Sequence, residues 1–295
     1  MRYAAIDIGS NAVRLLIADI IQNNEVVSFK KNTLVRVPLR LGDDAFIEQS
    51  ISQPKADDLV KTMSAFRNLM DVYKVEAYMA CATSAMREAE NGGSLVAQIR
   101  ASGIDLQIID GAKEAEIIYN SHIEQQLGGK KVYLYIDVGG GSTELSLFAD
   151  TRLVASASFN IGTIRILDNQ DDEETWNEMK DWVKTHTGMF KNVYGVGTGG
   201  NINKLSRLAN DKEDKPISYT KLKSIYEYLN SFSLKDRINV LGLNNDRADV
   251  IIPACEIFLT LMKYGRLRQI IVPRVGLVDG IIQTLIDQHQ DENRS

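Results

Sequence analysis

The chain has 295 residues, 44% of them hydrophobic, and a net charge of −5, which allows two domains with ordinary cores. The acidic balance and a pI near 5.4 argue against general binding to nucleic acid or to a membrane surface. We expect a cytoplasmic protein without a signal peptide, because a strand pattern begins at once and no run of about 20 apolar residues could span a bilayer. The cysteines, Cys81 and Cys255, form no CxxC pair and are expected to be buried free thiols.

The first half is predicted to begin with three consecutive strands, after which helices and strands alternate. An amphipathic helix is predicted after Ser52 and Pro54, because apolar residues recur there at helical spacing. Shorter helices are predicted from Ser84, around residues 95–101 and from Gly111. The predicted strands are residues 3–8, 12–21, 25–37, 75–82 and 106–109.

The second half repeats this order. Predicted strands are residues 131–138, 143–148, 152–159, 191–196 and 269–272. Predicted helices lie near Ile164, at 173–185, 201–208, 219–232 and 248–264, and from Gly276, with a polar surface loop at 210–216. The repeat predicts an α/β fold in two similar lobes, residues 1–124 and 125–280, with a crossover near 125–131. The last helix, residues 281–295, is expected to pack back on the first lobe, and the lobes are expected to hinge.

One motif occurs twice. Residues 6–11 read IDIGSN and residues 136–144 read IDVGGGSTE, so that Asp7 and Asp137 lie 130 residues apart (137 − 7). Each copy ends an apolar strand and passes through glycine into a second strand. Glycine lets backbone N–H groups approach a ligand together, as in phosphate sites, and the adjacent Asp can hold Mg²⁺. The pair predicts two hairpins that face one another across a phosphate-binding cleft.

The glycine motifs have other possible interpretations. An ordinary hairpin turn is the alternative for each copy, but the run Gly139, Gly140, Gly141 is costly in conformational entropy, and pairing with the first copy favours phosphate binding. Residues 195–200 match GxGxxG, which permits a dinucleotide site. That match lies in mid-chain and no strand ending in an acidic residue follows it, so a third wall of the cleft fits better.

Several catalytic chemistries lack their residues. The three histidines, His122, His186 and His289, show no HxxxH or HExxH spacing, which argues against a zinc hydrolase. Neither a GxSxG elbow nor a Walker A loop occurs. Catalysis must therefore rest on carboxylates, backbone amides, arginines and a hard metal ion.

Two side chains outside the glycine motifs are further candidates. Arg87 follows a predicted strand at a loop-to-helix junction, where anions are often bound, although a surface cap or an ion pair would equally place it there. Glu114 lies in the first turn of a predicted helix, where the macrodipole alone favours an acidic residue. By the residues alone that structural role is preferred over a general base.

Taken together, the motifs resemble the exopolyphosphatase/guanosine pentaphosphate phosphatase family, within the acetate kinase, sugar kinase, heat-shock chaperone and actin superfamily. The resemblance rests on residues 5–11, 82–87, 136–145, 195–200 and 247–249. It implies two ribonuclease H-like (actin-like ATPase) lobes and hydrolysis of the terminal phosphoanhydride bond of inorganic polyphosphate by metal-assisted attack of water. The alternatives are a guanosine pentaphosphate 5′-phosphatase and a small superfamily kinase.

The resemblance also assigns roles to individual residues. Glu114 positions or deprotonates the attacking water, while Asp137 and Glu144, with Asp7, hold Mg²⁺ or another divalent cation. The implied phosphate-binding residues are Gly9, Ser10, Asn11, Arg87, Gly139, Gly140, Gly141, Ser142 and Thr143. The expected partner is polyphosphate or guanosine pentaphosphate, with no nucleic acid or membrane, and the expected assembly is a homodimer.

The chain departs from the family pattern around the base. The family usually has SGxEEAR there, whereas residues 110–116 read DGAKEAE. Glu114 is retained, but Asp110, Lys113 and Glu116 replace the usual Ser, Glu and Arg, and Ala12 replaces a usual Ser in the first motif. These departures leave the base in place and bear on turnover and substrate preference.

Overall fold

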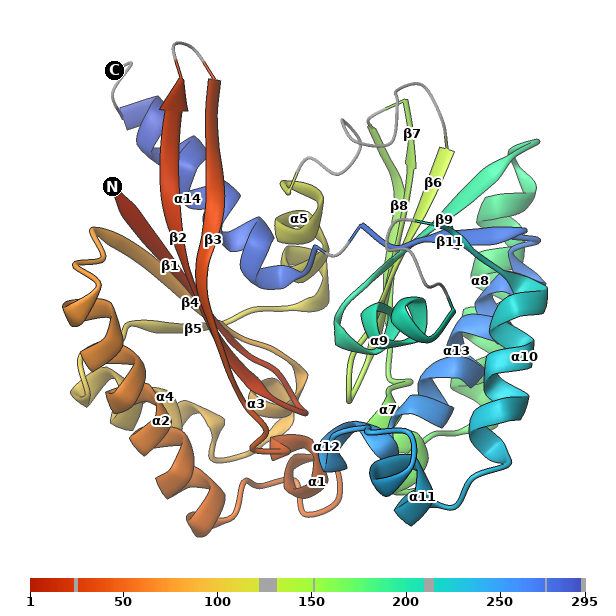
Figure 1. The fold of residues 1–295 in the computed structure, drawn as a ribbon, viewed down its shortest axis with the longest axis horizontal. Helices are drawn as coiled ribbons and strands as arrows, with labels where there is room; N and C mark the ends of the chain where they lie inside the picture. The colour runs from red at the N-terminus through yellow and green to blue at the C-terminus, as the bar shows by residue number, and fades with distance from the viewer. Residues whose placement is uncertain (24–25, 122–131, 151, 210–214, 274, 293–295) are drawn as a thin grey trace. The chain divides into compact units, whose positions relative to one another are not determined.

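The computed structural model describes residues 1–23, 26–121, 132–150, 152–209, 215–273 and 275–292. The chain forms two compact units: unit 1 is residues 1–121 with 276–295, and unit 2 is residues 122–275. Each unit is built on one β-sheet with packed helices (Figure 1). The predicted lobe boundary at 124/125 and the crossover at 125–131 lie outside the described residues.

Unit 1 contains a five-stranded sheet of order β3-β2-β1-β4-β5. β1, β2 and β3 form an antiparallel meander, and β4 and β5 continue parallel to β1. The strands are β1 (Arg2–Ile8), β2 (Val13–Asn23), β3 (Val26–Val37), β4 (Ala77–Ala82) and β5 (Leu106–Ile108). The helices are α1 (Leu41–Ala45), α2 (Gln53–Val72), α3 (Ser84–Glu88), α4 (Gly92–Ala101), α5 (Gly111–Tyr119) and α14 (Leu277–Glu292).

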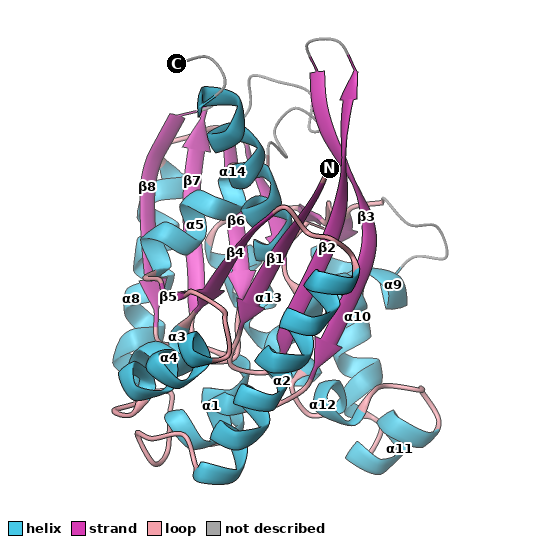
Figure 2. Ribbon diagram, turned by 90° about the vertical axis from the view of Figure 1, so that its left-hand side faces the viewer, coloured by secondary structure: helices cyan, strands magenta, loops and turns pink. Residues whose placement is uncertain are grey.

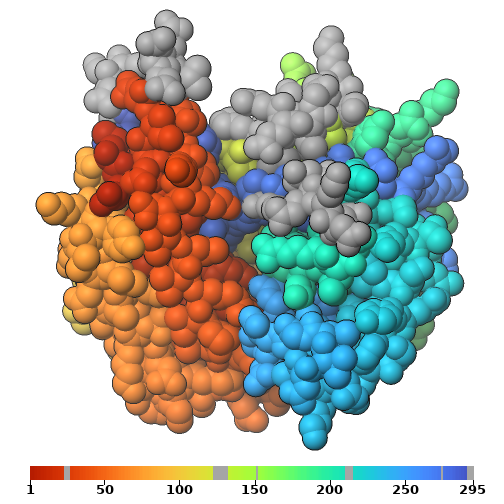
Figure 3. Space-filling model, viewed as in Figure 1, coloured from red at the N-terminus to blue at the C-terminus, as the bar shows by residue number. Residues whose placement is uncertain are grey.

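Helices cover both faces of this sheet, which explains why β1 is apolar on both faces (Figures 1 and 2). α5 and α14 pack on one face against residues such as Tyr3 and Cys81. α2 lies on the other side with α4, and its predicted apolar stripe is buried at four positions: Leu59, Met63, Phe66 and Met70. β3 forms the edge of the sheet, and none of its described side chains, residues 27–37, is buried; the β2–β3 hairpin, red to orange, covers much of unit 1 in Figure 3.

Unit 2 contains a six-stranded sheet of order β10-β11-β9-β6-β7-β8. β6, β7 and β8 form the antiparallel meander, and β9 and β11 are parallel to β6. The strands are β6 (Val132–Val138), β7 (Thr143–Ala149), β8 (Arg152–Phe159), β9 (Val193–Thr198), β10 (Ile217–Ser218) and β11 (Gln269–Ile271). The helices are α7 (Thr163–Leu167), α8 (Glu173–Gly188), α9 (Gly200–Ala209), α10 (Tyr219–Asn230), α11 (Leu234–Asn239), α12 (Asn245–Ala248) and α13 (Ile251–Tyr264).

The predicted repeat is confirmed, because each unit contains a meander of three antiparallel strands; the structure adds that the next strand after each meander, β4 or β9, runs parallel to its first strand. The antiparallel β6–β8 meander is unlike the parallel sheet of a dinucleotide-binding fold. The predicted helix 248–264 was wrong at its start, because α12 ends at Ala248 and α13 begins at Ile251. A continuous helix would need the N–H of residue 253 to bond the carbonyl of Asp249, and Pro253 has no N–H. Among the described helices, none has both the length and the apolar character for crossing a membrane.

Candidate active site

The two glycine motifs form turns of the same construction. In the N-terminal glycine turn (residues 9–12) the N–H of Gly9 donates to the carbonyl of Ala12 at 3.2 Å. In the C-terminal glycine turn (residues 139–142) the N–H of Gly139 donates to the carbonyl of Ser142 at 2.9 Å. Because these bonds are between main-chain groups, the replacement of the family's Ser by Ala12 does not remove the hydrogen bond that closes the turn.

One segment holds the carbonyls of all three glycines in the C-terminal glycine turn. The N–H of Thr163 donates to Gly139 (3.1 Å), and the N–H of Ile164 donates to Gly140 (2.8 Å). The guanidinium of Arg165, whose side chain is buried, donates from Nε to the carbonyl of Gly141 at 2.7 Å. With its carbonyls bound by the start of α7, the turn is held in one orientation.

Asp137 and Glu144 are direct partners across β6 and β7, which places both side chains on the same face of the sheet. Glu144 is only 4% exposed, and its Oε1 accepts hydrogen bonds from the hydroxyls of Ser142 (2.5 Å) and Ser158 (3.1 Å). Asp137 is partly exposed. Two hydroxyl donors thus hold the Glu144 carboxylate beside Asp137.

The GxGxxG segment, residues 195–200, lies beside Asp137, and its glycines leave space that a side chain would otherwise fill. Gly199 has a φ of +90°, and a Cβ there would lie 2.6 Å from Oδ1 of Asp137, so only glycine suits both the backbone and the carboxylate. At Gly200 a Cβ would lie 2.5 Å from Nη2 of Arg247, and Nη1 of Arg247 donates to Oδ1 of Asn201 at 3.3 Å. The segment therefore adjoins Asp137 within unit 2, together with an arginine that was given no role from the sequence.

The corresponding pair in unit 1 has a different charge. Asp7 faces Arg14 across β1 and β2, and Nη1 of Arg14 lies 2.5 Å from Oδ2 of the buried Asp7. Arg14 and Glu144 are 130 residues apart (144 − 14), the same spacing as the two aspartates. The hairpin of unit 1 thus carries an ion pair, Asp7 with Arg14, at the positions where the hairpin of unit 2 carries two carboxylates. Aligning the two repeats by their 130-residue spacing would have revealed this difference from the sequence.

Asp7 and Glu114 both act on the buried thiol of Cys81. Asp7 is paired in register with Cys81 across β1 and β4, and Glu114 lies, partly exposed, in the first turn of α5. Burial raises the pKa of Cys81 to about 12, and the negative charges of Asp7 and Glu114 add to the shift. The two carboxylates therefore belong to one electrostatic environment in unit 1.

The departures from the family pattern make contacts of their own on α5. Asp110 caps the helix by accepting from the N–H of Lys113 at 2.7 Å, a role the usual Ser would also fill. Nζ of Lys113 donates to Glu116 at 2.9 Å on the exposed side of the helix. Arg87 lies next to the same helix start, since its Nη1 donates to the carbonyl of Ile109 at 2.8 Å. Glu114 keeps its place in the first turn.

The predicted site residues fall into two groups. Unit 1 carries Asp7, Gly9, Ser10, Asn11, Arg87 and Glu114, at or just beyond the carboxyl ends of β1, β4 and β5. Unit 2 carries Asp137, Gly139, Gly140, Gly141, Ser142, Thr143 and Glu144, at the β6–β7 turn. Within the residues described, three or more His, Cys, Asp or Glu side chains nowhere gather as a metal cluster.

Known proteins are similar to this chain in both sequence and fold. Residues 23–289 match the model of the Ppx/GppA phosphatase family. A bifunctional 3-dehydroquinate synthase/phosphatase of Fusobacterium nucleatum is 29% identical over 285 residues, covering 88% of this chain and 43% of that protein. Exopolyphosphatase 1 of Mycobacterium leprae is 23% identical, covering 99% of this chain and 91% of that protein.

Two crystal structures confirm the predicted fold. An exopolyphosphatase from Cytophaga hutchinsonii superposes with a TM-score of 0.85 at 23% identity, covering 98% of each chain. The Ppx/GppA family member from Aquifex aeolicus superposes with a TM-score of 0.75 at 24% identity, again over 98% of each chain. The α/β fold with two sheets is therefore that of this family.

Proposed function

Because the family model matches most of its length, the chain belongs to the Ppx/GppA phosphatase family, and from this premise we propose that it hydrolyses the terminal phosphoanhydride bond of inorganic polyphosphate. The products are orthophosphate and a shortened chain. Relatives that align over nearly the whole chain are named exopolyphosphatases, which supports this substrate.

The pair of glycine turns is the observation that carries the proposal. In unit 2 the carbonyls of Gly139, Gly140 and Gly141 are bound by the start of α7. In unit 1 the carbonyls of Ser10 and Asn11 accept from Gly42 and Arg40. Main-chain carbonyls would repel an anion, so binding them away from the ligand favours phosphate contact through the amides. Phosphoryl transfer needs mostly this kind of positioning and charge stabilisation.

The residues of unit 2 fit a divalent cation such as Mg²⁺. Asp137 and Glu144 supply the hard oxygen ligands that Mg²⁺ prefers, and Mg²⁺ commonly takes only one or two protein carboxylates together with substrate oxygens and water. When bound, the ion would neutralise charge on the phosphate. Of the three predicted metal ligands, Asp7 is expected to bind the cation least strongly, because the ion pair with Arg14 already compensates its charge.

Glu114 is the general base of the proposed reaction and Arg87 the cation beside a neighbouring phosphate. A general base must lie within reach of the attacking water, and the partial exposure of Glu114 at the start of α5 gives water access to its carboxylate. Transfer of a water proton to Glu114 accompanies attack on the terminal phosphorus, and the bond to the bridging oxygen breaks.

Guanosine pentaphosphate is the second candidate substrate, because its terminal phosphate is chemically equivalent and the sequence motifs resemble a family that includes guanosine pentaphosphate phosphatases. We further propose Mg²⁺ as the metal, a homodimer as the assembly and the cytoplasm as the location. A superfamily kinase is less favoured, since the family to which the chain belongs is one of phosphatases.

Phosphate release tests the proposal. The purified protein with Mg²⁺ is assayed on tripolyphosphate, longer polyphosphates, guanosine pentaphosphate and ATP. We expect release from polyphosphate, loss of activity with EDTA and recovery with excess Mg²⁺. Glu144→Gln should mimic chelation, whereas Glu256→Gln, at a glutamate that accepts from Tyr226 on α10, should remain active. Absence of phosphate release from every polyphosphate, or activity that survives thorough chelation, would contradict the proposal.

A further inference from the structure

The N-terminal glycine turn is held by the backbone at the start of α1, at Arg40 and Gly42. The N–H of Gly42 donates to the carbonyl of Ser10 at 2.9 Å, and the N–H of Arg40 donates to the carbonyl of Asn11 at 3.1 Å. The hydroxyl of Ser10 also lies 2.8 Å from that of Ser84, in a buried contact. The orientation of the turn therefore depends on where the backbone of Arg40 and Gly42 lies.

The backbone of Arg40 is in an unfavourable conformation. Its φ of 50° and ψ of 49° place it in the left-handed region, which a residue with a side chain rarely adopts unless its surroundings hold it there. Two sets of contacts hold Arg40 in this conformation. Its guanidinium binds both carboxylate oxygens of Asp43, at 2.8 and 3.1 Å, and its main-chain carbonyl accepts a hydrogen bond from Nζ of Lys55 at 2.7 Å.

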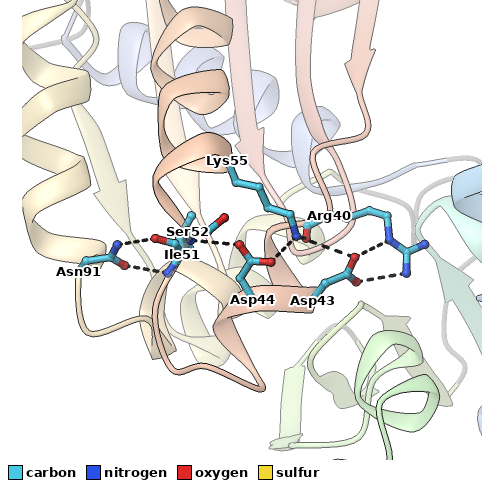
Figure 4. Close-up of polar contacts among 7 residues, drawn as sticks. All are labelled: Arg40, Asp43, Asp44, Ile51, Ser52, Lys55 and Asn91. Atoms are coloured by element: carbon cyan, nitrogen blue, oxygen red, sulfur yellow. Dashed lines mark hydrogen bonds and ion pairs between the residues drawn. The ribbon is translucent and has the colours of Figure 1, made fainter.

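Lys55 is itself fixed by a network drawn in Figure 4. Its Nζ lies 2.6 Å from Oδ1 of Asp44, and Oδ2 of Asp44 accepts from the N–H of Ser52 at 3.0 Å. Burial raises the pKa of Asp44, but the hydrogen bonds from Lys55 and Ser52 outweigh it, so that the pKa lies below its usual value. The ammonium of Lys55, in the first turn of α2, thus bridges the carboxylate of Asp44 and the carbonyl of Arg40, the residue in the left-handed conformation.

The network reaches a third helix. Asn91, before α4, exchanges two hydrogen bonds with the backbone of Ile51, at 2.7 and 3.0 Å. Ile51 precedes Ser52, whose N–H binds Asp44 (Figure 4). A continuous set of polar contacts therefore runs from α4 through the start of α2 to the residue that holds the glycine turn.

We propose that Lys55 is a positioning residue for phosphate binding: by holding the carbonyl of Arg40, it fixes the amide that orients the Ser10–Asn11 turn toward the substrate. This inference rests on the proposed function of the turn. In unit 2 a cation holds the glycine turn directly, since Arg165 binds the carbonyl of Gly141. In unit 1 the cation acts one residue further back, through Arg40, and does not itself touch the turn.

Lys55→Met tests the inference, because methionine keeps most of the stem and removes the ammonium. Lys61→Met is the matched control: it lies on the same helix, loses the same charge, and its side chain is 76% exposed with a single ion pair to Asp58 at 3.5 Å. Both variants are compared with the full wild-type chain by calorimetric titration with tripolyphosphate, by KM and kcat, by thermal unfolding and by amide hydrogen exchange.

Losing the hydrogen bonds of Lys55 is expected to weaken tripolyphosphate binding and raise KM by about 3- to 10-fold, with a smaller change in kcat. Amide exchange of Arg40 and Gly42 should accelerate, while Lys61→Met behaves as wild type. Asp44→Asn, which keeps an acceptor for Ser52 and removes the charge that holds Lys55, should show the same effect more weakly.

Each contrary outcome is informative. A lower melting temperature with unchanged KM and unchanged exchange at Arg40 and Gly42 would mean that Lys55 only stabilises the fold, and the inference would be wrong while the proposed function stood. An Asp44→Asn variant with wild-type KM and exchange would contradict the network even if Lys55→Met failed to fold. A wild-type protein that neither binds nor hydrolyses tripolyphosphate would overturn both proposals.

Discussion

Gly162→Ala should damage the C-terminal glycine turn without any backbone conflict at the mutated residue itself. Gly162 has a φ of −143° and a ψ of 162°, an extended conformation that alanine adopts freely. The added Cβ is the whole perturbation. It would lie 2.5 Å from the carbonyl carbon of Gly141 and would overlap the carbonyl group of Gly140 more closely still.

The magnitude follows from these contacts. Because Cβ contacts under 3.0 Å essentially never occur, the turn and the start of α7 must separate by at least about 0.5 Å at Gly141 and by more at Gly140. Overpacking of this kind costs about 1–3 kcal/mol. Displacing substrate-binding atoms by about 1 Å can cost on the order of 10² in rate. We therefore expect kcat/KM to fall by about 10- to 100-fold and unit 2 to melt about 2–10 °C lower.

Phosphate release from tripolyphosphate and thermal unfolding, measured on the same preparations, check both numbers. Gly93→Ala is the control, because no atom lies within 4 Å of its added Cβ and the position is in α4, where alanine is favoured over glycine. It should keep full activity and equal or higher stability. Gly162→Ala with wild-type kcat/KM and melting temperature would refute the idea that the start of α7 sets the position of the turn.

Four further predictions concern the base, the thiols, a buried acid and the substrate. Glu114→Gln should lower kcat by about 10²–10⁴ in the phosphate-release assay. Burial, and to a smaller extent nearby carboxylates, raises the pKa of Cys81 and of Cys255 to about 12. At pH near 8 only about 10⁻⁴ of each thiol is therefore present as thiolate. A disulfide reagent should react with these thiols on the order of 10³-fold faster after the protein is unfolded in guanidinium chloride. Burial raises the pKa of Asp279 in the folded protein despite its ion pair with Lys31. The resulting contribution to the free energy of unfolding is present below the unfolded pKa of about 4 and is lost as pH rises through the folded pKa. The free energy of unfolding of wild type, relative to that of Asp279→Asn, should therefore decline between these two pKa values. For the substrate, kcat/KM should rise little beyond short polyphosphates and depend only modestly on salt, because the chain is net acidic.

These predictions have plain counter-results. Near-wild-type turnover in a folded Glu114→Gln protein would end its assignment as base. Rapid labelling of the native thiols would contradict their burial, and a flat stability difference across pH would contradict the desolvation of Asp279. A kcat/KM that keeps growing with chain length would reveal an extended basic track.

The sequence by itself determined the features that depend on short-range pattern. Alternating and continuous apolar runs located the strands, and helical spacing located α2, because both periodicities are properties of consecutive residues. The Asp–Gly motifs at Asp7 and Asp137 predicted two similar turns, since glycine marks close backbone approach wherever it occurs. The short helix α1 was not predicted, because five residues carry too little periodicity to identify.

Only the tertiary structure decided what holds each turn. The carbonyl of Gly141 is bound by Arg165, 24 residues away, and the carbonyl of Arg40 by Lys55, 15 residues away. Asp7 proved to be neutralised by Arg14. A main-chain carbonyl has the same chemistry in every residue, so its partner leaves no mark in the sequence. Which cation reaches it depends on how separate helices and strands pack, and that is decided by the whole fold.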